Sequence, residues 1–135
     1  MNMSAIMEEM GVALDSVEGL RGFSYPANAV VPPAAMVGWP YDIDYALTMT
    51  PGAWSAVFPV LVVVGKSDVR SARDAMSAHL AGSGPSSVMA ALNGGLHTAY
   101  DAARMTKAHV EPVSIAGIEY LGAIIDVAVT GQGGM

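Results

Sequence analysis

An apolar run over residues 54–64 leads directly into a pattern of helical spacing, so the sequence predicts a strand that runs straight into a helix. Residues 60–64 are all β-branched or aliphatic, which is typical of a strand covered on both faces. Gly65 ends the run, and Ser67 can cap the helix that follows. The apolar residues of that helix recur at helical spacing, at Val69, Ala72, Met76 and Leu80. The stretch therefore predicts a central strand followed by a helix that lies back on the sheet.

The junction Gly65-Lys66-Ser67 invites comparison with a phosphate-binding P-loop, which also lies between a buried strand and a helix. A P-loop needs a glycine five residues before its second glycine, and this chain has Val60 there. Strand residues would fill what must be an open cradle of backbone amides. We therefore interpret the junction as a glycine hinge, a solvated lysine and a helix cap, and expect no cofactor.

The length of 135 residues predicts one domain over residues 1–130, followed by a flexible glycine-rich tail over residues 131–135. The chain has no cysteine, so it has neither disulfides nor thiolate metal ligands. Charged residues make up 13%, against about 25% in an ordinary soluble domain. No apolar run approaches the roughly 20 residues of a membrane helix. We therefore expect no membrane partner, and expect the surplus apolar surface to be buried against other subunits.

The remaining patterns predict an α+β fold with a mostly antiparallel sheet of about five strands. A helix with apolar spacing over residues 3–17 precedes an extended loop over residues 20–33. Its methionines are interpreted first as core, with an adaptable partner surface as the alternative. Two helices follow the third strand and pack on the sheet. The expected strands cover residues 34–38, 41–49, 54–64, 102–115 and 118–129, and the two later helices cover residues 69–80 and 85–92.

Asp42 and Asp44 are two residues apart in an expected strand, so both project from one face. Two such carboxylates can hold a cation or act in acid–base chemistry. A calcium loop would need another oxygen ligand at Ala46, which has none. We therefore favour a solvated or intersubunit polar face. Pro59 cannot donate to a ladder of strand hydrogen bonds, so it indicates an edge or bulge where another subunit could pair.

Basic side chains gather at Lys66, Arg70 and Arg73, but Asp68 and Asp74 are interleaved with them. The favoured interpretation is a solvated helix face. A net charge of −6 also opposes binding to phosphate backbones, so nucleic acid is not expected as a tight ligand. The full set of candidate residues for a subunit or partner interface is Trp39, Asp42, Asp44, Trp54, Pro59, Lys66, Arg70 and Arg73.

No local motif predicts catalysis. Ser24 lies in a sequence that starts like a hydrolase nucleophile elbow, but Pro26 replaces the closing glycine and no strand precedes it. The three histidines, His79, His97 and His109, are too far apart along the chain to form a metal-ligand pattern. We therefore expect no catalytic residue and no metal site.

Several strings, in their combined order, give the chain a resemblance to the tail terminator proteins of long-tailed bacteriophages that infect actinobacteria. None of them is a chemical motif, but together they cover most of the chain. The strings are Gly19-Leu20-Arg21 with Tyr25-Pro26, Val31-Pro32-Pro33-Ala34-Ala35, Asp42-Ile43-Asp44-Tyr45, Ser71-Ala72-Arg73-Asp74, Leu80-Ala81-Gly82-Ser83-Gly84-Pro85-Ser86-Ser87-Val88 and Gly117-Ile118-Glu119-Tyr120-Leu121.

This resemblance implies a non-enzymatic α+β domain of the virion that assembles in the host cytoplasm. Such proteins form a ring, usually a hexamer, that caps the head-proximal end of the tail tube and joins it to the head connector. The implied partners are other copies of the chain, the tail tube protein and a head completion or stopper protein, with DNA only as cargo in the lumen. One departure is Ala116-Gly117-Ile118, where the family would have a paired glycine turn.

Two alternatives remain open at this point. The first is a head-side stopper or adaptor protein of the same connector. The second, from another class, is a small acidic ligand-binding domain or enzyme. A ring protein should have several times its monomer mass, whereas an enzyme should carry a convergent polar pocket with a shifted titrating group.

Overall fold

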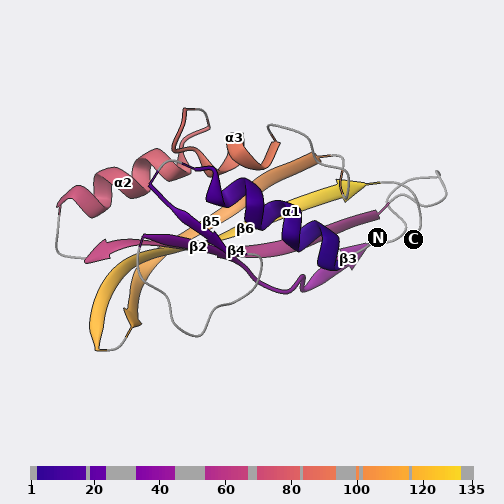
Figure 1. Cartoon of the computed structure of the whole chain (residues 1–135). Coiled ribbons are helices and arrows are strands. Elements are labelled where there is room, and N and C mark those ends of the chain that lie inside the picture. Colours follow the sequence, from indigo (N-terminus) through magenta and orange to yellow (C-terminus); the bar gives the residue numbers. More distant parts are fainter. Residues whose placement is uncertain are drawn as a thin grey trace.

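The computed structural model describes residues 3–17, 19–23, 33–44, 54–66, 70–82, 84–93, 100, 102–115 and 117–131. These residues form a mixed α/β fold in which a six-stranded, mostly antiparallel sheet is combined with three helices (Figure 1). In chain order, the elements are α1 (Met3–Asp15), β1 (Arg21–Phe23), β2 (Ala34–Val37), β3 (Asp42–Asp44), β4 (Trp54–Lys66), α2 (Arg70–Leu80), α3 (Val88–Asn93), β5 (Ala102–Ile115) and β6 (Ile118–Gly131).

Strand β4 is the centre of the sheet, whose order is β1-β2-β4-β6-β5. One side of β4 pairs along its length with β6. The other side pairs with β2 near its C-terminal end and with β3 near its N-terminal end. All these pairings are antiparallel, whereas β1 pairs with β2 in parallel. The apolar run therefore forms the central strand of the sheet, as the sequence predicted.

Pro59 lies within this central strand, so the expectation that it marks an edge or bulge is wrong. Its carbonyl accepts a hydrogen bond of 2.7 Å from the Gly38 amide, on the side of β4 that faces β2 and β3. Two residues earlier, the Val57 carbonyl accepts from the Tyr41 amide on the same side. The nitrogen of Pro59 therefore faces the break between β2 and β3. A missing donor is tolerated there because no ladder partner continues across the break.

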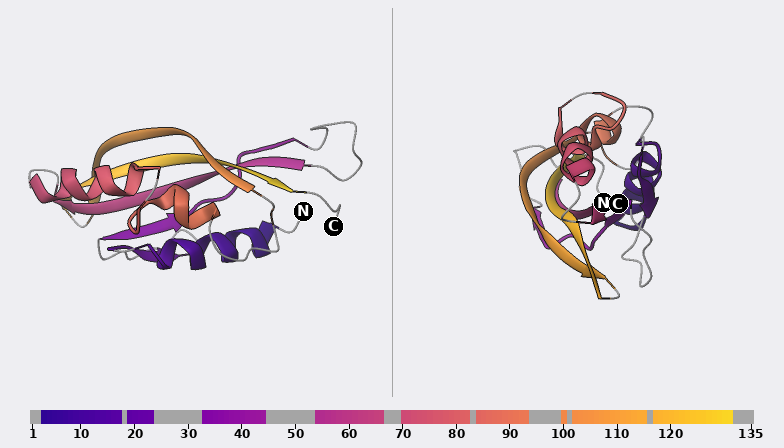
Figure 2. Two further views of the ribbon diagram at one scale, coloured as in Figure 1. Left: turned by 90° about the horizontal axis from the view of Figure 1, so that it is seen from above. Right: turned by 90° about the vertical axis from the view of Figure 1, so that its left-hand side faces the viewer.

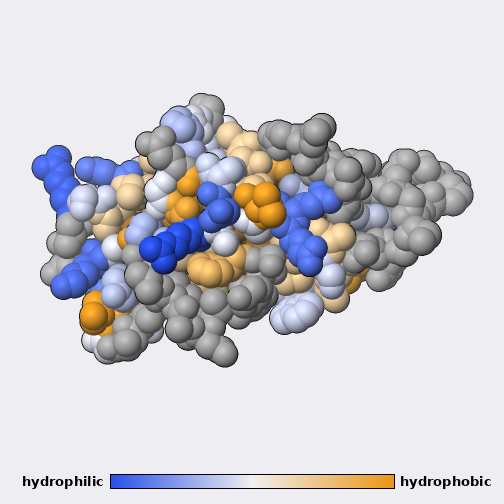
Figure 3. Space-filling view, in the orientation of Figure 1, coloured by the Kyte–Doolittle hydropathy of each residue, from blue (hydrophilic) through white to orange (hydrophobic). Residues whose placement is uncertain are grey.

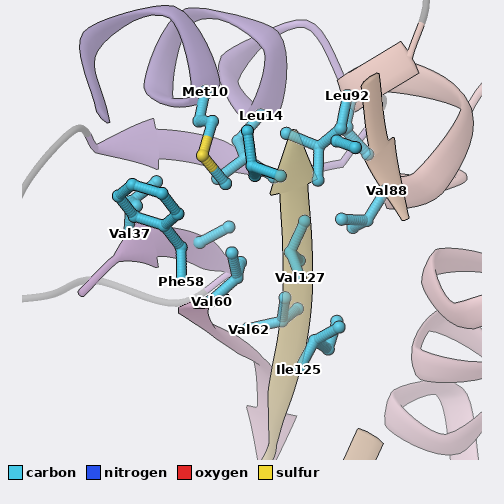
Figure 4. Packing of buried hydrophobic residues seen from close by; sticks show 14 of the residues in the cluster. Met10, Leu14, Val37, Phe58, Val60, Val62, Val88, Leu92, Ile125 and Val127 are labelled. Carbon is cyan, nitrogen blue, oxygen red and sulfur yellow. The ribbon is translucent and has the colours of Figure 1, made fainter. Parts of the chain in front are cut away.

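The core lies between one face of the sheet and the helices. Alternate residues of β4 and β6 point into it, among them Phe58, Val60, Val62, Ile125 and Val127, and they meet Met10 and Leu14 of α1 and Val88 and Leu92 of α3 (Figure 4). The methionines Met7 and Met10 are buried, as the core interpretation of that helix predicted. The described helices lie on this side of the sheet and none covers its other face (Figure 2). The prediction that β4 is covered on both faces therefore holds only near its C-terminal end, where Val63, on the face away from the helices, is fully buried. On the same face, Val57, Pro59 and Leu61 are half-buried.

Strand β1 is a sixth strand within the segment expected to be a loop. It lies directly against α1, where a Cβ atom added at Gly22 would overlap the backbone of Gly11 and Asp15. The Gly22 amide also donates a 3.0 Å hydrogen bond to the Asp15 carboxylate. Because glycine has no Cβ atom, Gly22 allows this close approach.

Other boundaries differ in smaller ways. Strand β4 continues through Gly65 to Lys66, because an irregularity between Val63 and Gly65 absorbs one extra residue. Gly131 ends β6 opposite Trp54, so the flexible tail cannot begin there. The described residues do not include the rest of that tail, Ser67 or the second half of the strand expected over residues 41–49. The expected strand over residues 102–115 matches β5.

Candidate functional site

The face of the sheet opposite the helices carries a shallow apolar groove. Met36, Leu61 and Ile124 lie side by side across β2, β4 and β6, because each is the ladder partner of the next. With Gly38 and Pro59 they line a groove of about 230 Å³. Ile124 is 39% exposed. Leu61 is half-buried and Met36 is 7% exposed, so of the three only Ile124 is exposed. An apolar groove on a sheet face without a helix over it is a place where side chains of another protein can pack.

Two aromatic residues closely follow Gly38, which lines this groove, on the connection from β2 to β3. Trp39 is 60% exposed and Tyr41 is 61% exposed. A hydrogen bond with Asp126 is the main cause that raises the pKa of the Tyr41 hydroxyl, and the charge of Asp42 adds to it. Tyr41 therefore lies close to both carboxylates. Exposed tryptophan and tyrosine are residues enriched at protein interfaces.

Carboxylates border the groove at the end of the sheet where β3 lies. Asp42 and Asp44 are opposite Val57 and Ser55 of β4, and both are exposed. Asp126 is the partner of Pro59 across β4 and β6. The register places all three on the same face as the groove, because directly paired residues project to the same side. Lys107, which is opposite Asp126 on β5, is the nearest basic residue in the ladder.

The basic candidates lie at the other end of β4. Lys66 is exposed and pairs with Tyr120. Arg70 and Arg73 are exposed in the first turn of α2. None of these three forms an ion pair with a residue in the described parts of the chain. Figure 1 shows that the start of α2 and β3 lie at opposite ends of the molecule, and hydrophilic side chains project from the α2 end (Figure 3).

Trp54 is the candidate that the structure removes from the surface. It is 2% exposed and belongs to the core, on the helix side of β4. A Cβ atom added at Gly131 would come within 2.5 Å of the Trp54 ring, so the indole lies directly on that glycine. Its ring nitrogen is buried and has no hydrogen-bond partner among the described residues. Its proposed role as an interface residue is therefore corrected to a core role.

A second groove, of about 440 Å³, lies between the end of β4 and α2 and is lined in part by Lys66, Ser71 and His79. His79 is buried, and its Nδ1 lies 2.9 Å from the Ser86 carbonyl, to which it donates. The hydroxyl of Ser87 bonds to the Ala81 carbonyl and caps α3. These contacts close the turn between α2 and α3, so His79 has a structural role there.

Other residue types with catalytic or ligand-binding potential are dispersed. His109 contacts Glu111 at 3.4 Å in an exposed pair, and His97 lies outside the described residues. Within the described ranges, no three His, Asp or Glu residues gather as metal ligands. None of the described helices combines the length and apolar character needed to span a membrane.

The described structure thus divides the expected interface residues between two surfaces. Pro59 lines the groove and Asp126 is its ladder partner, while Trp39, Tyr41, Asp42 and Asp44 follow the groove residue Gly38 along the connection to β3 and along β3 itself. We call this surface the acidic groove. Lys66, Arg70 and Arg73 form a separate group, which we call the basic end. The sequence interpretation missed Met36, Leu61 and Ile124, because an apolar face looks the same in a sequence whether a helix covers it or not.

Comparison with models of known protein families found no match for this chain, and comparison with curated proteins also found none.

Proposed function

We propose that this chain is a structural subunit of a phage virion and that it forms a ring, a hexamer by the resemblance, that caps the head-proximal end of the tail tube. The ring would stop tube polymerisation and join the tail to the head connector. The observation that carries the proposal is the apolar row of Met36, Leu61 and Ile124 on the open face of the sheet. A subunit of a ring must bury such a face against a neighbour.

Two features of the sequence support this role. The strings that resemble tail terminators run from residue 19 to residue 121. The net charge of −6 suits the wall of a channel through which DNA passes, because a basic wall would bind the phosphates and slow ejection. The tail tube protein and a head completion or stopper protein are then the expected neighbours.

A head-side stopper or adaptor protein would use the same kinds of surface, and it remains the alternative within this class. The groove beside His79 is the observation that favours a ligand-binding domain or enzyme instead. Against that alternative, the Nδ1 proton of His79 is held by the Ser86 carbonyl. No described carboxylate or cysteine lines this groove to act with it.

The experiment that tests the proposal is the mass of the purified chain by light scattering, alone and in the presence of assembled tail tubes. The monomer has a mass of 13.9 kDa. A ring requires a species of several times that mass, free or bound to tubes. A chain that stays monomeric, does not bind tubes and binds a small ligand in the groove beside His79 would contradict the proposal and favour the ligand-binding alternative.

A further inference from the structure

We infer that the acidic groove of one copy receives the basic end of α2 from a second copy, so that successive subunits join head to tail. This inference rests on the proposed ring and names the contact that closes it. The occupant is the first turn of α2, with Arg70 and Arg73, and the receiving surface is the groove bordered by Asp42, Asp44 and Asp126.

The first support is the complementary chemistry of the two surfaces. Arg70 and Arg73 are three residues apart, so they project from the same side of α2. Arginine has an apolar stem and a planar charged head. The stems can lie on the apolar floor at Leu61 and Ile124, while the guanidinium groups reach the carboxylates at its border. Tyr41 and Trp39 offer aromatic faces to the same cations.

The second support is that the two surfaces cannot meet within one chain. The strand between Val57, opposite Asp42, and Lys66 spans roughly 30 Å. Exposed charges interact over about 8 Å at physiological salt. The acidic groove and the basic end therefore attract each other only between copies. Because each surface meets a different surface on its neighbour, the contact is heterologous, and a heterologous contact that closes makes a ring.

The third support is that the arginines are locally unfavourable where they lie. The N-terminal end of a helix carries a partial positive charge and favours acidic residues. The first turn of α2 has none, and it carries Arg70 and Arg73 instead. The first turn of this helix is thus charged against its own dipole, as expected if the arginines serve a contact outside the subunit.

The test reverses each surface separately. In one variant, Asp42→Lys and Asp44→Lys make the acidic groove basic, so that both contact surfaces are basic. In the other, Arg70→Glu and Arg73→Glu make the basic end acidic, so that both contact surfaces are acidic. Each variant alone should lose assembly, measured as the mass by light scattering, free and on tail tubes. Mixed in equal amounts, the two should recover it, because every junction then joins an acidic surface to a basic one. Recovery on mixing excludes misfolding as the cause of the loss.

The matched controls place the same changes of charge elsewhere. Arg21→Glu reverses an exposed basic side chain of β1, and Glu8→Lys reverses an exposed carboxylate of α1. Both controls should assemble as the unchanged chain does. Loss of assembly in the Arg21 control, with the Arg70 and Arg73 variant unaffected, would overturn the inference and assign the contact to the edge of the sheet at β1.

The outcomes also separate this inference from the proposed function. If the unchanged chain assembles and both reversed variants assemble equally well, the head-to-tail contact is wrong while the ring remains. A complex of only two copies would likewise overturn the head-to-tail contact, because a two-fold pair uses both surfaces in one interface. If the unchanged chain neither self-associates nor binds tubes, the proposed function and this inference both fail.

Discussion

Val62 and Leu61 are consecutive residues of β4 that face opposite sides of the sheet. Val62 is fully buried beneath the helices, in contact with the core cluster. Leu61 lies on the open face, between its ladder partners Met36 and Ile124. One residue thus stabilises the subunit, and the other lines the surface that we assign to assembly.

The pair gives the first prediction. Val62→Asp buries an unpaired charge and should cost more than about 4 kcal/mol, enough to unfold most of the protein. Leu61→Asp places the same side chain on the open face, so it should cost only about 1 kcal/mol but abolish assembly. Thermal unfolding followed by circular dichroism measures the first effect, and light scattering measures the second. A Val62→Asp protein with an unchanged melting temperature would refute the placement of that residue in the core.

The aspartates of β3 give the second prediction. The double change Asp42→Ala and Asp44→Ala should weaken assembly more than folding, because both side chains are exposed at the acidic groove. Aspartate is also a poor strand residue, so the unfolding free energy should change by less than about 1 kcal/mol. The readouts are the oligomer mass and the melting temperature of the same sample. An unaltered oligomer mass would remove these aspartates from the interface.

The close approach of β1 to α1 gives the third prediction. Gly22→Ala should destabilise the fold by about 2–3 kcal/mol, because the new Cβ atom would overlap the backbone of Gly11 and Asp15. The matched control is Gly82→Ala, where nothing lies within 4 Å of the new atom. That control should change the unfolding free energy by less than about 0.5 kcal/mol. Equal stability of the two variants in denaturant titrations would contradict the packing of β1 on α1.

Tyr100 gives the fourth prediction, which concerns alkaline pH. Its hydroxyl donates a 2.8 Å hydrogen bond to the Leu92 carbonyl, and burial, with the charge of Glu9, raises its pKa from 10.0 to about 12. The folded protein therefore retains the proton more tightly than the unfolded chain. The stability that this provides is complete below pH 10 and is lost as the pH rises from 10 to 12.

The variant that tests this is Tyr100→Phe. At pH 7 it should cost about 1–2 kcal/mol, because the hydrogen bond to Leu92 is lost and the carbonyl stays buried. Between pH 10 and 12 its stability should fall less steeply than that of the unchanged chain. Denaturant titrations at several pH values measure both effects. Parallel pH profiles for the two proteins would show that Tyr100 does not titrate in this way.

The sequence predicted those elements whose signals are local. Strand β5 has the predicted bounds, and β4 and β6 begin where their apolar patterns begin. Strand β1 was missed because its evidence is not local: three residues with a central glycine become a strand only through pairing with β2 and packing on α1. Pro59 was misplaced for a similar reason, since the break between β2 and β3 that accommodates it is a property of the folded sheet.

The candidate site was predicted only in part. Asp42 and Asp44 share an exposed face, as their spacing predicted, and the basic residues project from the start of α2. Trp54 shows the limit of the argument from residue type, because a tryptophan favoured at interfaces is equally favoured in a core. Leu61 was assigned to a covered face because an apolar strand sequence does not show which of its two faces a helix of the same chain covers.

The most direct measurement is electron microscopy of assembled tail tubes mixed with the purified chain. A tail terminator should add ring-shaped density to one end only of each tube, and tubes grown in its presence should stop lengthening. Tubes with both ends bare, and with the same length distribution as tubes grown alone, would contradict the proposal that this chain caps the tail.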